Sequence, residues 1–147
     1  MKYPLACDTW DQREIKAIHE VIEGGRYTMG PKVKQFEKEF CEYFKCKDAV
    51  MVNSGSTANL LMLAILKEKY KLGGIFAVNL LGNSCDYEKI KEIADKHGLI
   101  LIEDNCESLG AINNDLDKYT GTIGKMGSFS FFFSHHLQTM EGGMIAC

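Results

Sequence analysis

Three short runs of apolar residues constrain the fold of this 147-residue chain more than any other feature. The runs at 48–53, 75–83 and 99–104 are apolar at successive positions, which is typical of strands buried on both faces of a sheet. Helical patterns separate the runs, as they do when helices join neighbouring parallel strands. This order predicts an α/β fold with a mostly parallel sheet and helices on both faces.

Helical spacing of apolar residues predicts four helices, and two further strands are expected near the end of the sequence. Thr9 is expected to cap the first helix, with Gln12 three residues later as its partner. The two strands are expected at 127–133 and 143–147. The expected helices are Thr9 to Gly24, 33–44, 54–70 and Asp86 to Gly98.

Charge and composition exclude several classes of function. The net charge of −3 and the pI near 5.8 give no basic surface for nucleic acid or an anionic membrane. No stretch approaches the roughly 18 apolar residues of a membrane-spanning helix, and the first residues turn polar too early for a signal peptide. The six cysteines form no C-x-x-C pair. We therefore expect a cytoplasmic location and neither a nucleic-acid nor a membrane partner.

The segment 53–59, NSGSTAN, places glycine and small hydroxyl residues between a strand and the start of a helix. Unpaired backbone N–H groups and the positive end of the helix dipole favour an anion such as a phosphate at this position. Gly55 would let a ligand approach the backbone, and Ser56 and Thr57 would supply hydroxyl groups. The same residue types are ordinary helix caps, so this segment alone leaves both interpretations open.

Two carboxylates, Glu103 and Asp104, stand where a buried strand ends, which is where open α/β sheets present ligand-binding groups. A carboxylate there could hold a cationic ring nitrogen, bind a metal or cap the next turn. The turn is a common role of Asp after a strand. A metal is less favoured, because no His or Cys accompanies these carboxylates at a recognisable ligand spacing.

Two adjacent histidines, His135 and His136, follow the aromatic run SFSFFF at 128–133. Along a continuing strand their side chains would point to opposite faces, so they would make a poor metal chelate. A single imidazole acting as a base near neutral pH is chemically better motivated. A loop histidine satisfied by solvent is the alternative.

Taken in order, SGSTAN, EDNCESLGA and SFSFFFSHH followed by EGG resemble the cofactor-binding segments of the DegT/DnrJ/EryC/StrS sugar aminotransferase family, within the fold-type I pyridoxal-phosphate enzymes. The resemblance implies a partial large domain of that fold. It also implies that Gly55, Ser56 and Ser130 bind the cofactor phosphate and that Asp104 binds the pyridine nitrogen. Glu107 would interact with the cofactor at the ring edge, or would be a surface charge.

His135 stands five residues beyond Ser130, where the family has the lysine that anchors the cofactor. Histidine cannot form that imine, so the resemblance implies a noncovalent cofactor, most usefully pyridoxamine 5′-phosphate in place of pyridoxal 5′-phosphate. A subgroup of the family, the sugar 3-dehydratases, shares this replacement. His136 is expected to face away from the site and to have no role.

The segments YPLA at 3–6 and TMEGG at 139–143 resemble those of 3-dehydratases that act on a GDP-linked 4-keto-6-deoxy sugar in deoxysugar biosynthesis for lipopolysaccharide O-antigens. The resemblance implies that His135 removes a proton from the cofactor, that the C3 hydroxyl leaves as water, and that glutamate restores the amine. A 3-dehydratase that acts on a CDP-linked sugar is the alternative. A lysine-dependent aminotransferase is less favoured, because 126–147 contains no lysine.

Compared with the family, the chain lacks several dozen residues near 73–75, among them an aromatic residue that stacks on the cofactor. It also stops at Cys147, before the small C-terminal domain. Residues 1–147 are therefore expected to be an incomplete large domain. A noncatalytic remnant is the alternative to an enzyme, and a homodimer is expected of the full-length protein.

Overall fold

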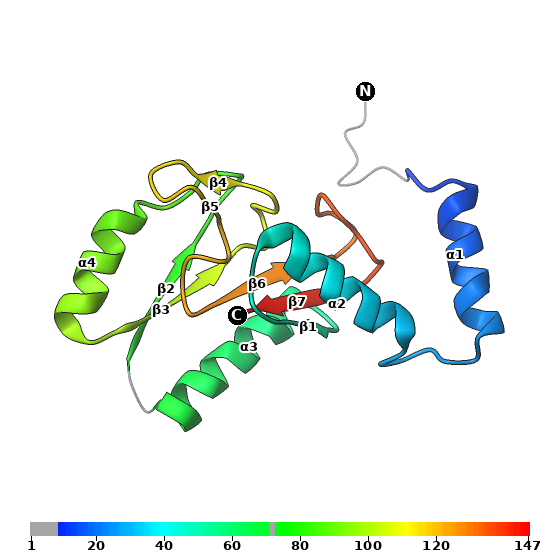
Figure 1. Cartoon of the computed structure of the whole chain (residues 1–147), viewed down its shortest axis with the longest axis horizontal. Coiled ribbons are helices and arrows are strands. Elements are labelled where there is room, and N and C mark those ends of the chain that lie inside the picture. The colour runs from blue at the N-terminus through cyan, green and yellow to red at the C-terminus, as the bar shows by residue number, and fades with distance from the viewer. Residues whose placement is uncertain (1–8, 71–72) are drawn as a thin grey trace.

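Helices and strands alternate from α2 to β3, and only strands follow (Figure 1). The computed structural model describes residues 9–70 and 73–147, so the YPLA segment at 3–6 lies outside the described residues. The helices are α1 (Gln12–Glu23), α2 (Pro31–Phe44), α3 (Gly55–Ile65) with a π-helical extension (Leu66–Tyr70), and α4 (Tyr87–His97). The strands are β1 (Ala49–Val52), β2 (Gly74–Val78), β3 (Ile100–Asp104), β4 (Ile112–Asn113), β5 (Lys118–Tyr119), β6 (Met126–Ser130) and β7 (Gly143–Ala146).

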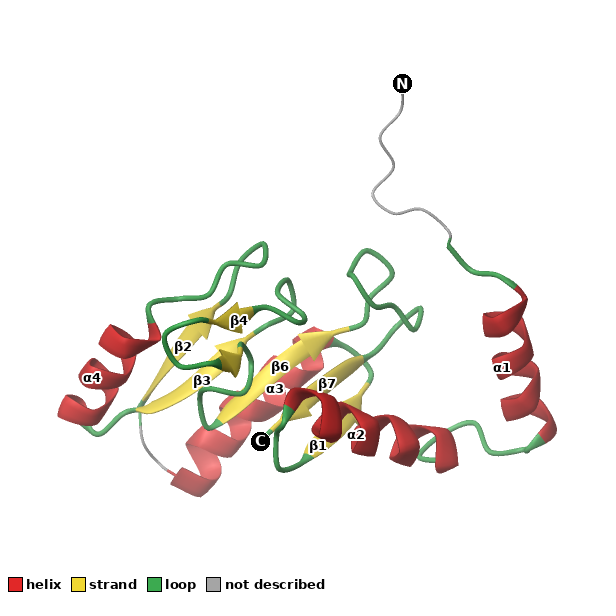
Figure 2. Cartoon of the chain, turned by 45° about the horizontal axis from the view of Figure 1, so that its top comes forward, coloured by secondary structure: helices red, strands yellow, loops and turns green. Residues whose placement is uncertain are grey.

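Five strands form the central sheet in the order β1, β7, β6, β3 and β2 (Figure 2). β2 and β6 both pair with β3 in parallel, whereas β7 is antiparallel to both of its neighbours, β6 and β1. Four of the five strands therefore run in one direction and end at the same edge of the sheet. The prediction of a mostly parallel sheet is confirmed.

Helices cover both faces of the sheet, as predicted. On one face α3 packs through Met62 onto a cluster that includes Ile102 of β3. On the other face α2 packs onto β6, where the rings of Phe40 and Phe129 meet edge to face with their centroids 4.9 Å apart. α4 covers β2 and β3 on that same face through Tyr87, which is fully buried. Figure 2 shows the sheet lying between α3 and α2.

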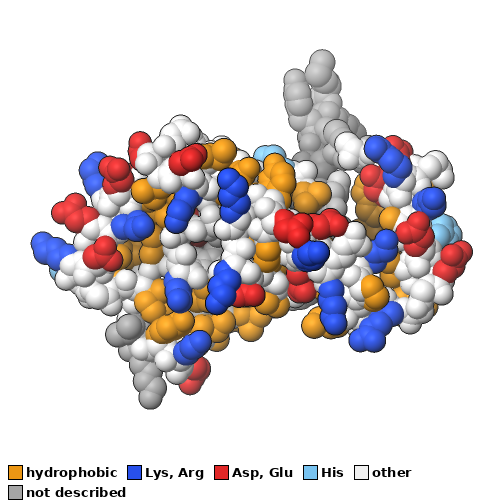
Figure 3. Space-filling view, in the orientation of Figure 1, with side chains coloured by type: hydrophobic (Ala, Val, Ile, Leu, Met, Phe, Trp, Pro, Cys, Tyr) orange, Lys and Arg blue, Asp and Glu red, His pale blue; other side chains and the backbone are white. Residues whose placement is uncertain are grey.

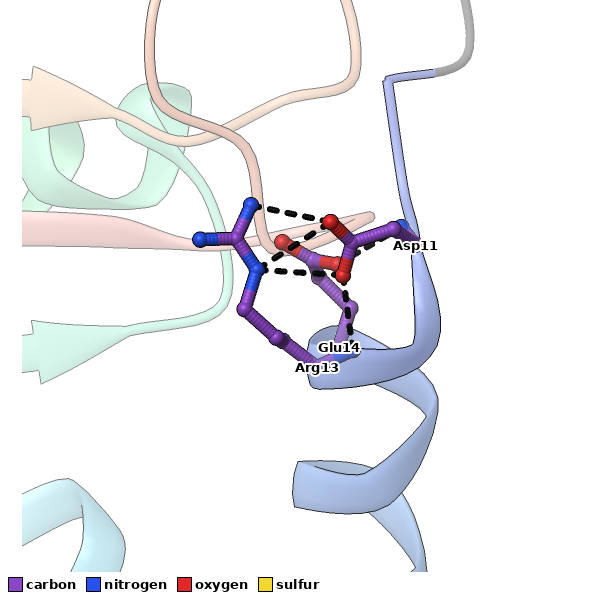
Figure 4. A network of polar contacts seen from close by, with 3 residues as sticks. All are labelled: Asp11, Arg13 and Glu14. Atoms are coloured by element: carbon purple, nitrogen blue, oxygen red, sulfur yellow. Dashed lines mark hydrogen bonds and ion pairs between the residues drawn. The ribbon is translucent and has the colours of Figure 1, made fainter.

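α1 begins at a carboxylate cap that lies two residues after the predicted one. Asp11 is the N-cap, and its side chain accepts a hydrogen bond from the backbone N–H of Arg13 at 2.7 Å (Figure 4). The Glu14 carboxylate in turn accepts one from the backbone N–H of Asp11, also at 2.7 Å. The prediction of Thr9 and Gln12 is wrong, because this reciprocal acidic pair satisfies the first N–H groups of the helix.

α1 lies apart from the sheet in both ribbon views and buries none of its residues. Its apolar stripe of Ile15, Ile18 and Ile22 stays 36% to 52% exposed. The core of the described chain is therefore built without α1. None of the described helices is long and apolar enough to cross a membrane.

Two strands end earlier than predicted, and a short hairpin has no counterpart in the prediction. β2 ends at Val78, and the chain then turns at Leu81 and Gly82, which both adopt a positive φ, of 53° and 82°. β6 ends at Ser130, so the two histidines that follow lie on a turn and not on a strand. The hairpin of β4 and β5 consists of strands of two residues, which are too short for a periodic signal.

A buried carboxylate on β3 ties together the parts of the fold that surround the sheet edge. Glu103 is fully buried, on the face opposite to the side chain of Asp104. Its donors, with their distances, are Tyr87 Oη (2.9 Å), Asn79 Nδ2 (3.3 Å), and the backbone N–H groups of Gly121, Ile123 and Gly124 (2.6 Å each). Burial and the neighbouring Glu103 charge raise the pKa of Tyr87, so its hydroxyl stays a donor. Glu103 thereby joins β2, α4 and the 121–124 loop to β3.

We predict that Glu103→Gln lowers the free energy of unfolding by about 2 to 4 kcal/mol, because an amide leaves several buried donors without a matching acceptor. Urea denaturation measures the change. Glu92→Gln, at an exposed position of α4, is the matched control and should leave stability unchanged. Equal stability of the two variants would contradict the role given to Glu103.

Candidate active site

The three segments singled out in the sequence meet at Gly55, in the first turn of α3. A Cβ atom on Gly55 would lie 2.7 Å from both Cys106 Sγ and Ser130 Cβ, which is closer than side chains approach one another. Only glycine therefore fits here. The contact brings the start of α3, the loop after β3 and the end of β6 together at the edge where the parallel strands end. Ligands of open α/β sheets bind at this edge.

The start of α3 is arranged to bind an anion. The Ser54 side chain is the N-cap and accepts a hydrogen bond from the Thr57 N–H at 3.1 Å. The N–H groups of Gly55 and Ser56 lie in the first turn, where a helix offers no internal acceptor and its dipole is positive. Ser56 is exposed, and the Ser130 hydroxyl is half-buried beside Gly55. These groups suit a phosphate.

Gly143, two residues after Glu141, is the second glycine of the site. A side chain on Gly143, at the start of β7, would overlap the backbone carbonyl of Ser54. Glycine lets β7 pass directly beneath the start of α3. In the sequence this glycine stands out only as part of the EGG motif.

Asp104 is half-buried and oriented by two hydrogen bonds. Its Oδ2 accepts from Asn59 Nδ2 at 2.8 Å, and its Oδ1 accepts from the Cys106 backbone N–H at 3.0 Å. A carboxylate has about four acceptor positions, so Asp104 can still accept from a protonated ring nitrogen. Asn59 Oδ1 is buried with no partner among the described residues, although buried acceptors are normally paired. A donor from a ligand would satisfy it.

Asn59 is a site residue that the sequence analysis missed. It lies four residues after Gly55, one turn along α3, and this spacing puts both residues on one face of the helix. That spacing is the signal that could have found it.

Cys106 is a second missed residue. Burial, and then its hydrogen bond to Asp104 and the charge of that carboxylate, raise the pKa of the Cys106 thiol to about 12. The thiol therefore stays protonated and acts as one more donor near Asp104. Its place in the EDNCESLGA motif, two residues after Asp104, is the signal that could have found it.

His135 lies on the turn that follows β6, and its backbone N–H donates to the Phe132 carbonyl at 2.9 Å. An open depression of about 450 Å³ is lined by Leu81, Glu107, Ser134, His135 and His136. His135 and Glu107 thus line the same depression, whereas Gly55, Asp104 and Ser130 are not among its lining residues. His136 also borders it, contrary to the expectation that this side chain faces away, because the chain turns where a strand was predicted.

No group of three His, Cys, Asp or Glu side chains within residues 9–70 and 73–147 is arranged to hold a metal ion. The sheet edge offers donors for a phosphate at the start of α3 and a carboxylate at Asp104, and the depression beside the turn after β6 carries the His135 imidazole. These are groups for an organic, phosphorylated ligand.

Comparison with known proteins gives the chain its relatives. The profile of the DegT/DnrJ/EryC1/StrS aminotransferase family matches residues 8–73 and 68–147. GDP-4-keto-6-deoxy-D-mannose 3-dehydratase of Yersinia pseudotuberculosis is 40% identical over 199 residues, which cover 99% of this chain and 50% of that protein.

Two solved structures of GDP-4-keto-6-deoxymannose-3-dehydratase are similar as well. A histidine-to-asparagine variant with bound GDP-perosamine has a TM-score of 0.89 at 38% identity, and covers 99% of this chain and 51% of its own. The enzyme with a trapped PLP-glutamate geminal diamine has a TM-score of 0.86, with the same identity and coverage.

The fold predicted from the sequence is therefore also the fold of these relatives. This chain spans about half the length of the curated relatives that it matches. The profile match nevertheless covers nearly all of its residues. The chain belongs to the DegT/DnrJ/EryC1/StrS aminotransferase family.

Proposed function

We propose that this chain forms the cofactor-binding part of a sugar 3-dehydratase, which removes the C3 hydroxyl of a GDP-linked 4-keto-6-deoxy-mannose in deoxysugar biosynthesis. One observation carries the proposal: His135 stands five residues after Ser130, where the family has lysine, and Ser130 lies against Gly55. The similarity to GDP-4-keto-6-deoxy-D-mannose 3-dehydratases supports the substrate.

The cofactor in this proposal is pyridoxamine 5′-phosphate, which alternates with pyridoxal 5′-phosphate. When bound, it supplies an amine that condenses with the C4 ketone and a pyridine ring that takes up electron density. Gly55, Ser56 and Ser130 would hold its phosphate. Asp104 would accept a hydrogen bond from the ring nitrogen and keep that nitrogen protonated. The unpaired Asn59 Oδ1 beside Asp104 supports a ligand with a donor at this position.

His135 would be the base of the reaction. Imidazole cannot anchor the cofactor covalently as the lysine of the family does, but it accepts a proton near neutral pH. Its place in the same depression as Glu107 supports this role. Glu107 would lie at the ring edge of the cofactor, as the resemblance implies.

Residues 1–147 would be part of the large domain, with a segment absent near 73–75. Two observations of the alignments support this: the profile matches in two pieces that meet at 68–73, and the alignment to the Yersinia enzyme spans 199 residues against 147 here. A groove of about 400 Å³ beside this junction has Leu63, Leu66 and Phe76 in its lining, which are apolar groups that a further segment would cover.

The partners in this proposal are the nucleotide sugar, glutamate as the source of the amino group, and a second copy of the full-length protein. Solved relatives with GDP-perosamine and with a PLP-glutamate adduct support the first two. The homodimer follows the family resemblance. The location would be cytoplasmic, where nucleotide sugars and glutamate are available.

We predict that pyridoxamine 5′-phosphate binds the chain saturably and that Asp104→Asn weakens this binding at least about tenfold, because the amide cannot stabilise a protonated ring nitrogen. Titration followed by cofactor absorbance measures the affinity. Asp95→Asn, on the exposed side of α4, is the control and should bind as the unmodified chain does. Absence of binding by the unmodified chain would instead favour a noncatalytic remnant.

We predict that borohydride treatment with pyridoxal 5′-phosphate leaves residues 126–147 unlabelled in the unmodified chain and labels them in His135→Lys. The segment has no lysine of its own, so only an amine introduced at the site can be trapped. Mass spectrometry of this segment reads the result, with His136→Lys as the matched control. Equal labelling of His135→Lys and His136→Lys, or no labelling of His135→Lys, contradicts the assignment of His135.

We predict that the isolated chain self-associates through its exposed apolar surface. Leu60 and Leu63 of α3 are 67% and 46% exposed, and Figure 3 shows hydrophobic side chains gathered over the lower edge, where α3 lies. Replacing both leucines with glutamine should shift sedimentation toward the monomer, because it removes apolar surface from contact. A monodisperse monomer before substitution would count against an absent segment that normally covers this surface.

A further inference from the structure

Leu81 combines two features that are unfavourable for a leucine. Its φ of 53° lies in the left-handed region, where Cβ crowds the following carbonyl oxygen. Its side chain is 77% exposed, so burial does not offset that cost. Gly82 follows with a φ of 82°, and two successive positive φ values are those of a type I′ turn, which favours Asn-Gly. Leucine is therefore the wrong residue for this turn on structural grounds alone.

Hydrogen bonds hold the Leu81 turn in a fixed position. The Asn83 N–H donates to the Leu80 carbonyl at 2.9 Å and closes the turn. The Gly82 N–H donates to Ser108 Oγ at 2.9 Å, and the Ser108 hydroxyl donates to the Asn79 carbonyl at 2.8 Å. Ser108 is buried on the segment that also carries Asp104 and Glu107. The turn and the candidate site thus form one connected unit.

Leu81 faces the depression that contains the candidate base. The other side chains of its lining are polar, namely Glu107, Ser134, His135 and His136. Leu81 is thus the single apolar side chain of the lining among the described residues. A 4-keto-6-deoxy sugar also carries a single apolar substituent on its ring, the methyl group at C5. The Leu81 side chain and this methyl group are both apolar, so contact between them is favourable.

We infer that Leu81 is a specificity-determining residue that selects a 6-deoxy sugar by packing against its methyl group. The inference rests on the proposed function. It adds the protein residue that would distinguish a 6-deoxy sugar from its 6-hydroxy counterpart. Strained residues are retained at functional sites because the strain is offset by what the residue does there. Here the strained turn keeps an apolar side chain in the depression that also contains His135.

The test compares the affinities of GDP-6-deoxymannose and GDP-mannose, which differ in one hydroxyl, by calorimetry on the whole chain loaded with pyridoxamine 5′-phosphate. The unmodified chain should prefer the 6-deoxy sugar roughly fourfold, as the burial of one methyl group gives. Leu81→Asn should reduce that preference toward one and raise the melting temperature, because Asn-Gly suits the turn. Leu81→Met should keep the preference.

Met29→Asn is the matched control, because Met29 also has a positive φ, of 49°, and is 67% exposed, but does not line the depression. It should raise the melting temperature without changing the sugar preference. An unchanged preference in Leu81→Asn overturns the inference, and so does equal affinity of the unmodified chain for the two sugars. Failure of the unmodified chain to bind either sugar overturns the proposed function, and the inference with it.

Discussion

The buried Glu103 carboxylate joins the end of β2, α4 and the 121–124 loop to β3. A charge with no exposure is tolerated in a protein interior only when its oxygens are fully hydrogen-bonded, and here donors from β2, α4 and the 121–124 loop supply those bonds. Because side chains alternate along β3, fixing Glu103 on one face fixes Asp104 on the other. The orientation of the Asp104 carboxylate is therefore set by Glu103, whose own side chain faces away from the site.

The candidate site depends equally on residues that lack a side chain. Gly55 leaves room for Cys106 and Ser130, and Gly143 leaves room for the backbone of Ser54, so the start of α3, the loop after β3, the end of β6 and the start of β7 meet within contact distance. The N–H groups at the start of α3 and the Asp104 carboxylate then lie on one side of the sheet. This convergence is what a phosphorylated pyridine requires of an α/β sheet edge.

Much of the fold could be predicted from the sequence, because buried parallel strands are apolar throughout and the apolar residues of helices recur at helical spacing. Contacts between individual residues that are far apart in the sequence cannot be predicted from these patterns. The sequence places Glu103 and Asp104 together at a strand end, and only the alternation of β3 in the folded sheet separates their roles. Cys106 and Asn59 lie inside the quoted motifs, but the sequence does not show that their side chains meet Asp104. The turn at Leu81 could not be predicted, since leucine is a residue that such turns disfavour.

The central claim is that Asp104 holds a protonated pyridine nitrogen in a noncovalently bound cofactor. Nitrogen NMR of ring-labelled pyridoxamine 5′-phosphate tests it most directly, at a pH where the free cofactor has lost its ring proton. We expect the chemical shift of a protonated ring nitrogen in the complex, and the shift of the neutral ring when Asp104 is replaced by Asn. A neutral ring nitrogen bound to the unmodified chain would contradict the account.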